Sequence, residues 1–164
     1  MTTPSTSSVS VTCTGTRVTP RLPGTCGRIT VNALVASAVT PLPLETWLPA
    51  PSQGAIGIEC RTEDSVTRGH LDALNDAPTR REVEAERALL EALGGSCHSP
   101  VGLLAIADAG RVALTAALFS ADGAERVDGE TTLDAQDGDG LRAFAADLLS
   151  GATPGIAALF SQNG

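Results

Sequence analysis

The sequence predicts an α+β fold, in which a three-stranded antiparallel sheet carries helices on one face. Three stretches have the apolar or alternating pattern of strands, and the turn sequences Asp108-Ala109-Gly110 and Ala121-Asp122-Gly123 separate them. These stretches are residues 101–107, 111–119 and 124–133. Helical patterns precede and follow the three strands, and helices in those positions pack on one face of such a sheet.

The helix before the sheet is expected to begin at a capping box, Thr79-Arg80-Arg81-Glu82, in which the Thr79 hydroxyl accepts the Glu82 amide. Its apolar residues keep helical spacing until the pair Gly94-Gly95, which ends it. The charged residues of this helix are interpreted as a solvated face with ion pairs: Glu82, Glu84, Glu86 and Glu91 with Arg80, Arg81 and Arg87.

The helix after the sheet is expected over about residues 140–149, ending at Gly151. Thr153-Pro154 then begins a short closing helix towards Phe160. One side of the longer helix is apolar, with Leu141, Phe144, Leu148 and Leu149.

Nearer the start of the chain, residues 55–58 have the pattern of a short apolar strand. Asp64 or Ser65 is expected to cap a helix that runs to about Asn75. Its inward residues are expected to be Val66, Leu71 and Leu74.

The 164 residues include 11 Arg, no Lys and 19 acidic residues, for a formal net charge of −8. Because phosphate binding depends on clustered cations, this charge argues against nucleic acid and an anionic membrane as partners. No apolar run approaches the roughly 20 residues of a membrane-spanning helix, and the first residues lack the basic start of a signal peptide. We therefore expect a cytoplasmic protein, with a core of Ala, Val, Leu and Ile because only 2% of residues are aromatic.

The first part of the chain differs in composition from the rest. Residues 1–44 contain three Arg and no acid, whereas residues 45–164 contain eight Arg and all nineteen acids. A stretch so rich in Ser, Thr, Pro and Gly cannot bury enough apolar area to offset the entropy of ordering it. Only residues 29–39 have the pattern of a strand or short helix there, and we expect residues 1–38 to be a disordered or foreign segment.

Metal and nucleotide sites are not predicted. The four cysteines, Cys13, Cys26, Cys60 and Cys97, lack CxxC spacing and are expected to be reduced, separate thiols. Residues 134–139 contain three Asp but lack the alternating spacing and the closing Glu of a calcium loop. Residues 53–57 are too short for a dinucleotide-binding fingerprint.

Cys97 lies in the loop between a helix end and the first strand of the sheet, and two interpretations are open. It is either a small buried hydrophobe or an accessible thiol, since the Gly94-Gly95 pair lets a bulky ligand approach. The partial negative charge of a helix C-terminus disfavours a thiolate, so thiol-protease chemistry is not expected although His98 is adjacent. His98 keeps a functional interpretation beside this loop, whereas His70 is interpreted as a surface residue.

Two stretches resemble signatures of the porphobilinogen deaminase (hydroxymethylbilane synthase) family. Residues 48–61 (LPAPSQGAIGIECR) resemble the first, and residues 85–88 (AERA) followed by residues 93–102 (LGGSCHSPVG) resemble the cofactor-attachment motif. The order and separation also fit, and the resemblance covers about residues 39–164. Ser96, which stands between the glycines and Cys97, departs from the commonest form of the motif.

The resemblance implies that Cys97 holds a dipyrromethane cofactor through a thioether, with Gly94, Gly95, Gln53 and Gly54 as further cofactor-binding residues. It implies a transferase of tetrapyrrole (porphyrin and heme) biosynthesis that condenses four porphobilinogen molecules head to tail and releases ammonia each time. Members of this family are typically monomeric.

By the same resemblance, residues 79–164 form the C-terminal cofactor-attachment domain, and residues 39–78 are an incomplete strand–helix remnant of a preceding α/β domain. The family's catalytic aspartate motif has no match here, so no catalytic residue is identified and we expect a truncated enzyme that is inactive alone. Residues 55–58 are then expected to lack sheet neighbours and to leave an exposed apolar edge. Two alternatives remain: a separate chain supplies the first domain, or the chain is a non-catalytic α+β binding or pyrrole-carrier module that uses Cys97.

Overall fold

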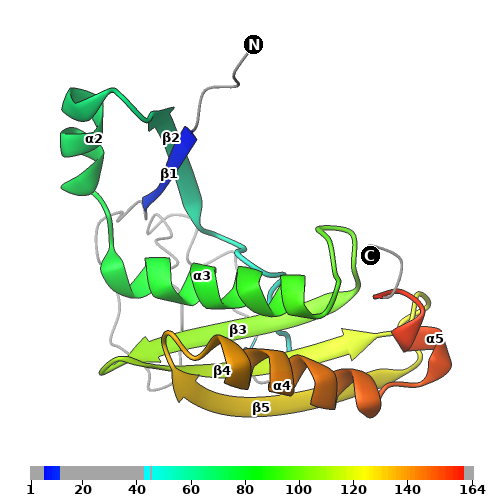
Figure 1. The fold of residues 1–164 in the computed structure, drawn as a ribbon. Coiled ribbons are helices and arrows are strands. Elements are labelled where there is room, and N and C mark those ends of the chain that lie inside the picture. Colours follow the sequence, from blue (N-terminus) through cyan, green and yellow to red (C-terminus); the bar gives the residue numbers. More distant parts are fainter. Residues whose placement is uncertain (1–5, 12–42, 45, 161–164) are drawn as a thin grey trace, which may run out of the picture.

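The structure, a computed structural model, describes residues 6–11, 43–44 and 46–160. Strands β3 (Val101–Asp108), β4 (Arg111–Phe119) and β5 (Arg126–Asp134) form an antiparallel sheet in the order β3-β4-β5. Helices α3 (Ala77–Ala92) and α4 (Gly138–Ser150) lie together on one face of this sheet (Figure 1). The predicted α+β class is therefore confirmed.

A tight turn sets the register between β3 and β4. Ala109 and Gly110 both have positive φ, 46° and 85°, and Asp108 pairs with Arg111 across them. Positive φ at both central residues is the geometry of a two-residue type I′ hairpin, which matches the twist of the strands it joins. The predicted turn at this place is confirmed.

The turn between β4 and β5 is longer than predicted. The Ser120 hydroxyl donates to Asp122 at 2.6 Å and accepts from the Glu125 amide at 2.9 Å, so residues 120–125 form a closed loop. Strand β5 therefore begins at Arg126, two residues after the expected start at residue 124.

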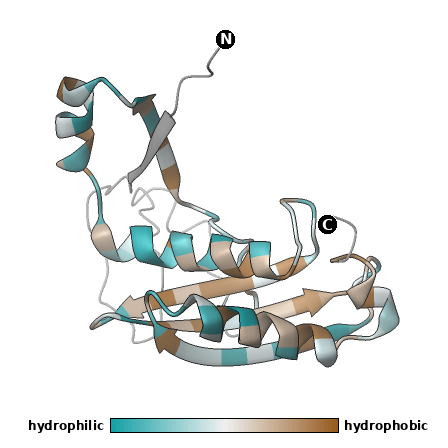
Figure 2. Cartoon of the chain, viewed as in Figure 1, coloured by the Kyte–Doolittle hydropathy of each residue, from teal (hydrophilic) through white to brown (hydrophobic). Residues whose placement is uncertain are grey.

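The hydrophobic core lies between the sheet and the helices α3 and α4. Alternate residues of β4 point towards these helices and are at most 2% exposed: Val112, Leu114, Ala116 and Leu118. The helices contribute Leu89, Leu93, Phe144 and Leu148 to the same core. Figure 2 shows the hydrophobic residues concentrated along β3 and β4 and the hydrophilic ones on the outer surface of α3. The core is mainly aliphatic, as the 2% aromatic content of the sequence predicts, with Phe144 and Phe160 as exceptions.

Helix α3 begins two residues before the predicted capping box. Asp76 is its N-cap, and the Asp76 carboxylate accepts from the Thr79 amide at 3.0 Å. Pro78 fits this start because the first turn of a helix needs no N–H from proline. The prediction that the Thr79 hydroxyl caps the helix through Glu82 is wrong, since Glu82 instead accepts from the Ala107 amide of β3 at 3.0 Å.

Helix α2 (Ser65–Asp72) has the predicted N-cap, because the Asp64 carboxylate accepts from the Thr67 amide at 3.0 Å. Of its three expected inward residues, only Leu71 is buried. Val66 is 71% exposed and Leu74 58% exposed, so the prediction for these two is wrong. This short helix contacts a two-stranded sheet, which covers Leu71 but leaves Val66 exposed.

The last two helices agree with the prediction. Asp137 caps α4, which ends at Gly151, and Phe144 and Leu148 of this helix are buried. Thr153 caps the short helix α5 (Pro154–Ala157), and the chain continues to the buried Phe160.

A second, two-stranded sheet lies near the N-terminal end of α3 (Figure 1). Strand β2 (Ile56–Arg61) pairs antiparallel with β1 (Thr6–Val11) along its whole length. The prediction that residues 55–58 lack sheet neighbours is therefore wrong, and so is the prediction that only residues 29–39 could be regular in the first part of the chain. Two strands can pair through backbone hydrogen bonds and β-branched side chains, so a strand does not require a continuous apolar sequence. Residues 29–39 lie outside the described residues, and beyond β1 the assignment of residues 1–38 stays a prediction.

Candidate functional site

The end of α3 positions the loop that carries Cys97. The Gly94 amide donates to the Glu91 carbonyl and the Gly95 amide to the Leu90 carbonyl, each at 2.9 Å. These two bonds, with φ of +69° at Gly94, form a Schellman motif, which needs glycine at the left-handed position. A Cβ at Gly94 would also clash with the Phe160 carbonyl oxygen, so the corner is packed against the backbone of Phe160.

The loop after this corner is held by its own serines. The Ser99 hydroxyl accepts from the Ser96 amide at 2.8 Å, and the Ser99 amide donates to the Ser96 carbonyl at 3.0 Å. The Ser96 hydroxyl accepts from the His98 amide at 3.3 Å. The departure from the commonest motif, Ser96, therefore contributes to the turn that surrounds Cys97.

Cys97 lies at the tip of this turn and is an exposed, free cysteine. Of the two interpretations left open by the sequence, the buried hydrophobe is wrong and the accessible thiol is confirmed. Because the hydrogen bonds of the loop come from backbone and serine groups, the sulfur can form a covalent bond without unfolding the corner. His98 is exposed beside it, and His70 is a surface residue, as expected.

Gln53 and Gly54 lie in a second turn, which the structure fastens to the middle of α3. The Gln53 side-chain oxygen accepts from the Ala50 amide at 3.0 Å, and Gly54 has a φ of +85°. The turn contacts α3 at Glu86 and Arg87, seven or eight residues before Gly94, which is about 10–12 Å along a helix. The structure thus brings Gly94, Gly95 and Cys97 into one loop and places Gln53 and Gly54 beside the same helix.

The sequence interpretation placed Glu86 on a solvated helix face, and this is wrong. Glu86 is only 8% exposed, and its carboxylate accepts from the Ser52 amide at 2.6 Å and the Ala105 amide at 3.1 Å. Burial raises the pKa of the Glu86 carboxyl, and these two amides oppose the rise in part. The signal was present in the sequence, since Glu86 has helical spacing with the buried Val83 and Leu89.

The acidic residues near α4 have structural roles. Asp137 accepts from the Gly140 amide at 2.8 Å as the cap of α4, and Asp139 pairs with Arg142. Within the described ranges, no group of three or more His, Cys, Asp or Glu residues is placed to hold a metal ion. In that same part of the chain, no helix combines the length and the hydropathy needed to cross a membrane.

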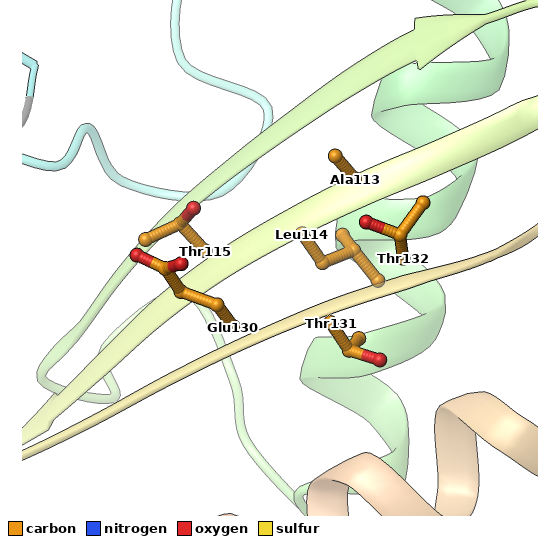
Figure 3. A pocket seen from close by; sticks show the side chains of 6 residues that line it. All are labelled: Ala113, Leu114, Thr115, Glu130, Thr131 and Thr132. Atoms are coloured by element: carbon orange, nitrogen blue, oxygen red, sulfur yellow. The ribbon is translucent and has the colours of Figure 1, made fainter.

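A depression of about 240 Å³ lies between β4 and β5 (Figure 3). Its lining residues are Ala113, Leu114, Thr115, Glu130, Thr131 and Thr132. All of them belong to these two strands, so the depression is separate from the loop that carries Cys97.

Comparisons with known proteins agree with this arrangement. Residues 80–143, which include Gly94, Gly95 and Cys97, match the family described as porphobilinogen deaminase, C-terminal domain. A porphobilinogen deaminase of Sphingopyxis alaskensis is 48% identical over 118 residues, which cover 71% of this chain and 37% of the relative. One of Brevibacillus brevis is 37% identical over 123 residues, which cover 74% of this chain and 40% of the relative.

A third relative, the porphobilinogen deaminase of Sorangium cellulosum, is 48% identical over 90 residues, or 55% of this chain and 30% of the relative. The chain thus spans 30–40% of the length of these curated relatives. The matched residues coincide with α3, the sheet and the start of α4, which form one hydrophobic core. The C-terminal part of this chain therefore belongs to the porphobilinogen deaminase family, as its C-terminal domain.

Proposed function

We propose that this chain is the cofactor-bearing part of a hydroxymethylbilane synthase (porphobilinogen deaminase), and that Cys97 is the attachment point of a dipyrromethane cofactor. The observation that carries the proposal is the exposed Cys97 thiol at the tip of a fixed glycine corner, inside the family-matched residues. The residues fit the group, because the thiol is accessible and the hydrogen bonds of its loop are made without it. When bound, a dipyrromethane supplies a pyrrole α-carbon as the nucleophile for chain extension.

The attachment chemistry suits this thiol. Loss of ammonia from the aminomethyl carbon of porphobilinogen leaves a strong electrophile at that carbon. The Cys97 sulfur forms one carbon–sulfur bond there, and the thiol proton is released to water. A single reaction with such an electrophile does not need a specially activated thiol.

The residues around Cys97 have distinct proposed roles. Gly94 and Gly95 hold the loop against α3 and leave room beside the sulfur. Gln53 and Gly54 are proposed to border the cofactor through the turn that Glu86 and Arg87 hold. Because no match to the family's catalytic aspartate motif occurs in this sequence, we propose that the chain holds a pyrrole pair but does not turn over porphobilinogen alone.

Incubation of the purified chain with porphobilinogen tests both parts of the proposal. Intact mass is expected to show an adduct of two pyrrole units that is absent in Cys97→Ala and retained in Cys60→Ala, the matched control at the half-buried cysteine. An adduct that survives in Cys97→Ala would refute the attachment site. The adduct itself accounts for two ammonia per chain, one for each pyrrole unit attached. Ammonia release beyond this amount, together with uroporphyrin formation above the Cys97→Ala background, would refute the proposed inactivity.

A second candidate function is a non-catalytic α+β binding or pyrrole-carrier module. The observation that favours it is the single core shared by α3, α4, α5 and the three-stranded sheet, which predicts that residues 79–164 fold without the rest. An isolated, cooperatively folded 79–164 domain with a bare Cys97 would support this candidate. Co-purification of a second polypeptide that restores turnover would favour a separately supplied first domain.

The cellular setting forms part of the same proposal. We infer reduced thiols, a cytoplasmic location and a monomer, with porphobilinogen as the small-molecule partner. The net charge of −8 and the absence of Lys support the expectation that nucleic acid and anionic membranes are not partners.

A further inference from the structure

The Glu86 carboxylate joins three segments that are far apart in the chain. Glu86 lies on α3, its Oε2 accepts from the Ser52 amide, and its Oε1 accepts from the Ala105 amide of β3. Both oxygens of a nearly buried carboxylate are therefore used by backbone donors. Such charge-assisted bonds are shorter and stronger than neutral ones, and the 2.6 Å distance to Ser52 fits this class.

The Ser52 turn has a backbone conformation that needs support. Ser52 has a φ of +61°, in the left-handed region that a residue with a Cβ adopts only at a cost. Arg87, the next residue on α3, donates from its Nε to the Ser52 hydroxyl at 3.2 Å. Two neighbouring helix residues therefore hold both the amide and the hydroxyl of Ser52 in place.

The segment before this turn is bound to the strand that follows Cys97. The Leu103 amide of β3 donates to the Pro49 carbonyl at 2.8 Å. A Cβ at Gly102 would lie 2.8 Å from the Leu48 Cβ, so the two backbones are in close approach. Residues 48–52 thus lie alongside β3. Glu86 accepts a hydrogen bond from each of the two segments, from Ser52 in the first and from Ala105 in β3.

We infer that Glu86 is a positioning residue, which fixes the Ser52-Gln53-Gly54 turn on the domain that carries Cys97. The inference rests on the proposed function, in which Gln53 and Gly54 border the cofactor that Cys97 holds. Glu86 acts through Ser52 and does not itself contact the reacting atoms.

Amide hydrogen exchange on the full 164-residue chain tests the positioning role directly. In Glu86→Gln one carboxylate oxygen becomes an NH₂ group, which cannot accept a hydrogen bond. We expect exchange at residues 52–54 to become roughly tenfold faster or more, the factor that corresponds to one lost bond to a charged group. Amides of the central strand β4 are expected to keep their slow exchange.

Two neighbouring glutamates provide matched controls. Glu82→Gln removes an acceptor from the same strand edge, at Ala107, and should leave exchange at Ser52 unchanged. Glu84→Gln removes an exposed ion pair with Arg80 and should change amide exchange at neither Ser52 nor Ala107. Unchanged exchange at Ser52 in Glu86→Gln, or an equal effect of Glu82→Gln there, would overturn the inference. If Glu86→Gln does not fold, Glu86→Asp keeps the charge, shortens the reach by one methylene and is expected to act in the same direction.

A second readout separates this inference from the proposed function. Adduct formation at Cys97 with porphobilinogen is expected to be roughly tenfold slower in Glu86→Gln than in Glu84→Gln, while alkylation of Cys97 by iodoacetamide is unchanged. Equal adduct rates in the two variants would overturn the positioning role. If no variant and no wild-type chain forms an adduct, the proposed function fails, and the exchange pattern alone decides whether Glu86 holds the turn.

Discussion

Glu86 of α3 accepts a hydrogen bond of 2.6 Å from the backbone amide of Ser52, which lies 34 residues earlier in the chain. This carboxylate lies within the buried stripe of the helix, beside Val83 and Leu89. A charge at such a position is tolerated because backbone donors replace the water that burial removes. The contact joins the segment of the Ser52 turn to the core of the C-terminal domain.

Replacement of Glu86 by Ala is expected to lower the free energy of unfolding by about 2–4 kcal/mol, because two backbone amides lose the carboxylate that accepts them. Glu84→Ala, on the exposed side of the same helix, is expected to change it by less than about 0.5 kcal/mol. Urea denaturation followed by circular dichroism measures both variants. Similar values for the two would show that the buried carboxylate contributes no more than a surface one.

Stability is expected to fall with rising pH through the titration of Glu86. Burial raises the pKa of this carboxyl, hydrogen bonds from the Ser52 and Ala105 amides lower it in part, and the charge of Glu82 raises it further. The folded chain therefore binds this proton more tightly than the unfolded chain. The contribution is fully present below the unfolded pKa, near 4.5, and is lost as pH rises through the folded pKa.

Urea titrations at a series of pH values check this dependence. In the window above the unfolded pKa, the unfolding free energy of the wild-type chain should decrease more steeply with pH than that of Glu86→Gln. Parallel curves for the two chains would exclude Glu86 as the titrating group.

Gly94→Ala is expected to destabilise the domain by at least about 2 kcal/mol, since it adds left-handed strain and a clash with the Phe160 carbonyl. Gly110→Ala is the matched control, because Gly110 also has positive φ but a Cβ there meets nothing within 4 Å. Gly110→Ala should lower the free energy of unfolding only by the cost of the left-handed backbone conformation, about 1 kcal/mol. Thermal and urea unfolding of both variants measure the difference, and an equal loss would mean that the contact with Phe160 has no energetic weight.

Asp76→Ala is expected to cost about 1 kcal/mol, the usual value for an N-cap, because the Asp76 carboxylate accepts from the Thr79 amide. Thr79→Ala is expected to cost clearly less, since the Thr79 hydroxyl does not cap the helix. The pair distinguishes the observed cap from the capping box suggested by the sequence. A larger loss in Thr79→Ala than in Asp76→Ala, measured by urea unfolding, would favour the capping box.

Cys97 is expected to react with a disulfide reagent roughly tenfold faster or more than Cys60, because Cys97 is exposed and Cys60 packs against Leu71. The measurement uses a chain in which Cys13 and Cys26 are replaced by Ser, followed by single Cys97→Ser and Cys60→Ser variants. Loss of the fast phase in Cys60→Ser, rather than in Cys97→Ser, would reverse the assignment.

The three-stranded sheet could be predicted because the residues that specify its strands and turns are close together in the sequence. Alternation along the strands and glycines at the turns specify the hairpins without reference to distant residues, as at Gly110. The accessible thiol could not be decided in this way, since a cysteine after a helix end is compatible with burial and with exposure. Its exposure follows from hydrogen bonds between Ser96 and Ser99, which depend on how the loop folds.

The role of Glu86 depends on contacts with two distant segments, and a charged residue in a helix with many charges gives no direct sign of them. The same limit explains the wrong prediction of a capping box at Thr79, because Glu82 accepts from the distant Ala107 amide instead. It also explains the missed strand β1, whose partner β2 lies 45 or more residues away. In each case the decisive partner is set by the tertiary arrangement rather than by local pattern.

The most apolar strand of the main sheet, β3, is also the one whose outer side is occupied. Its outward amides at Leu103, Ala105 and Ala107 already donate to Pro49, Glu86 and Glu82. An extended segment from a neighbouring molecule therefore finds no donors along this side with which to add as a fourth strand. The chain can carry a Val-, Leu- and Ile-containing edge at high concentration without fibril growth from it.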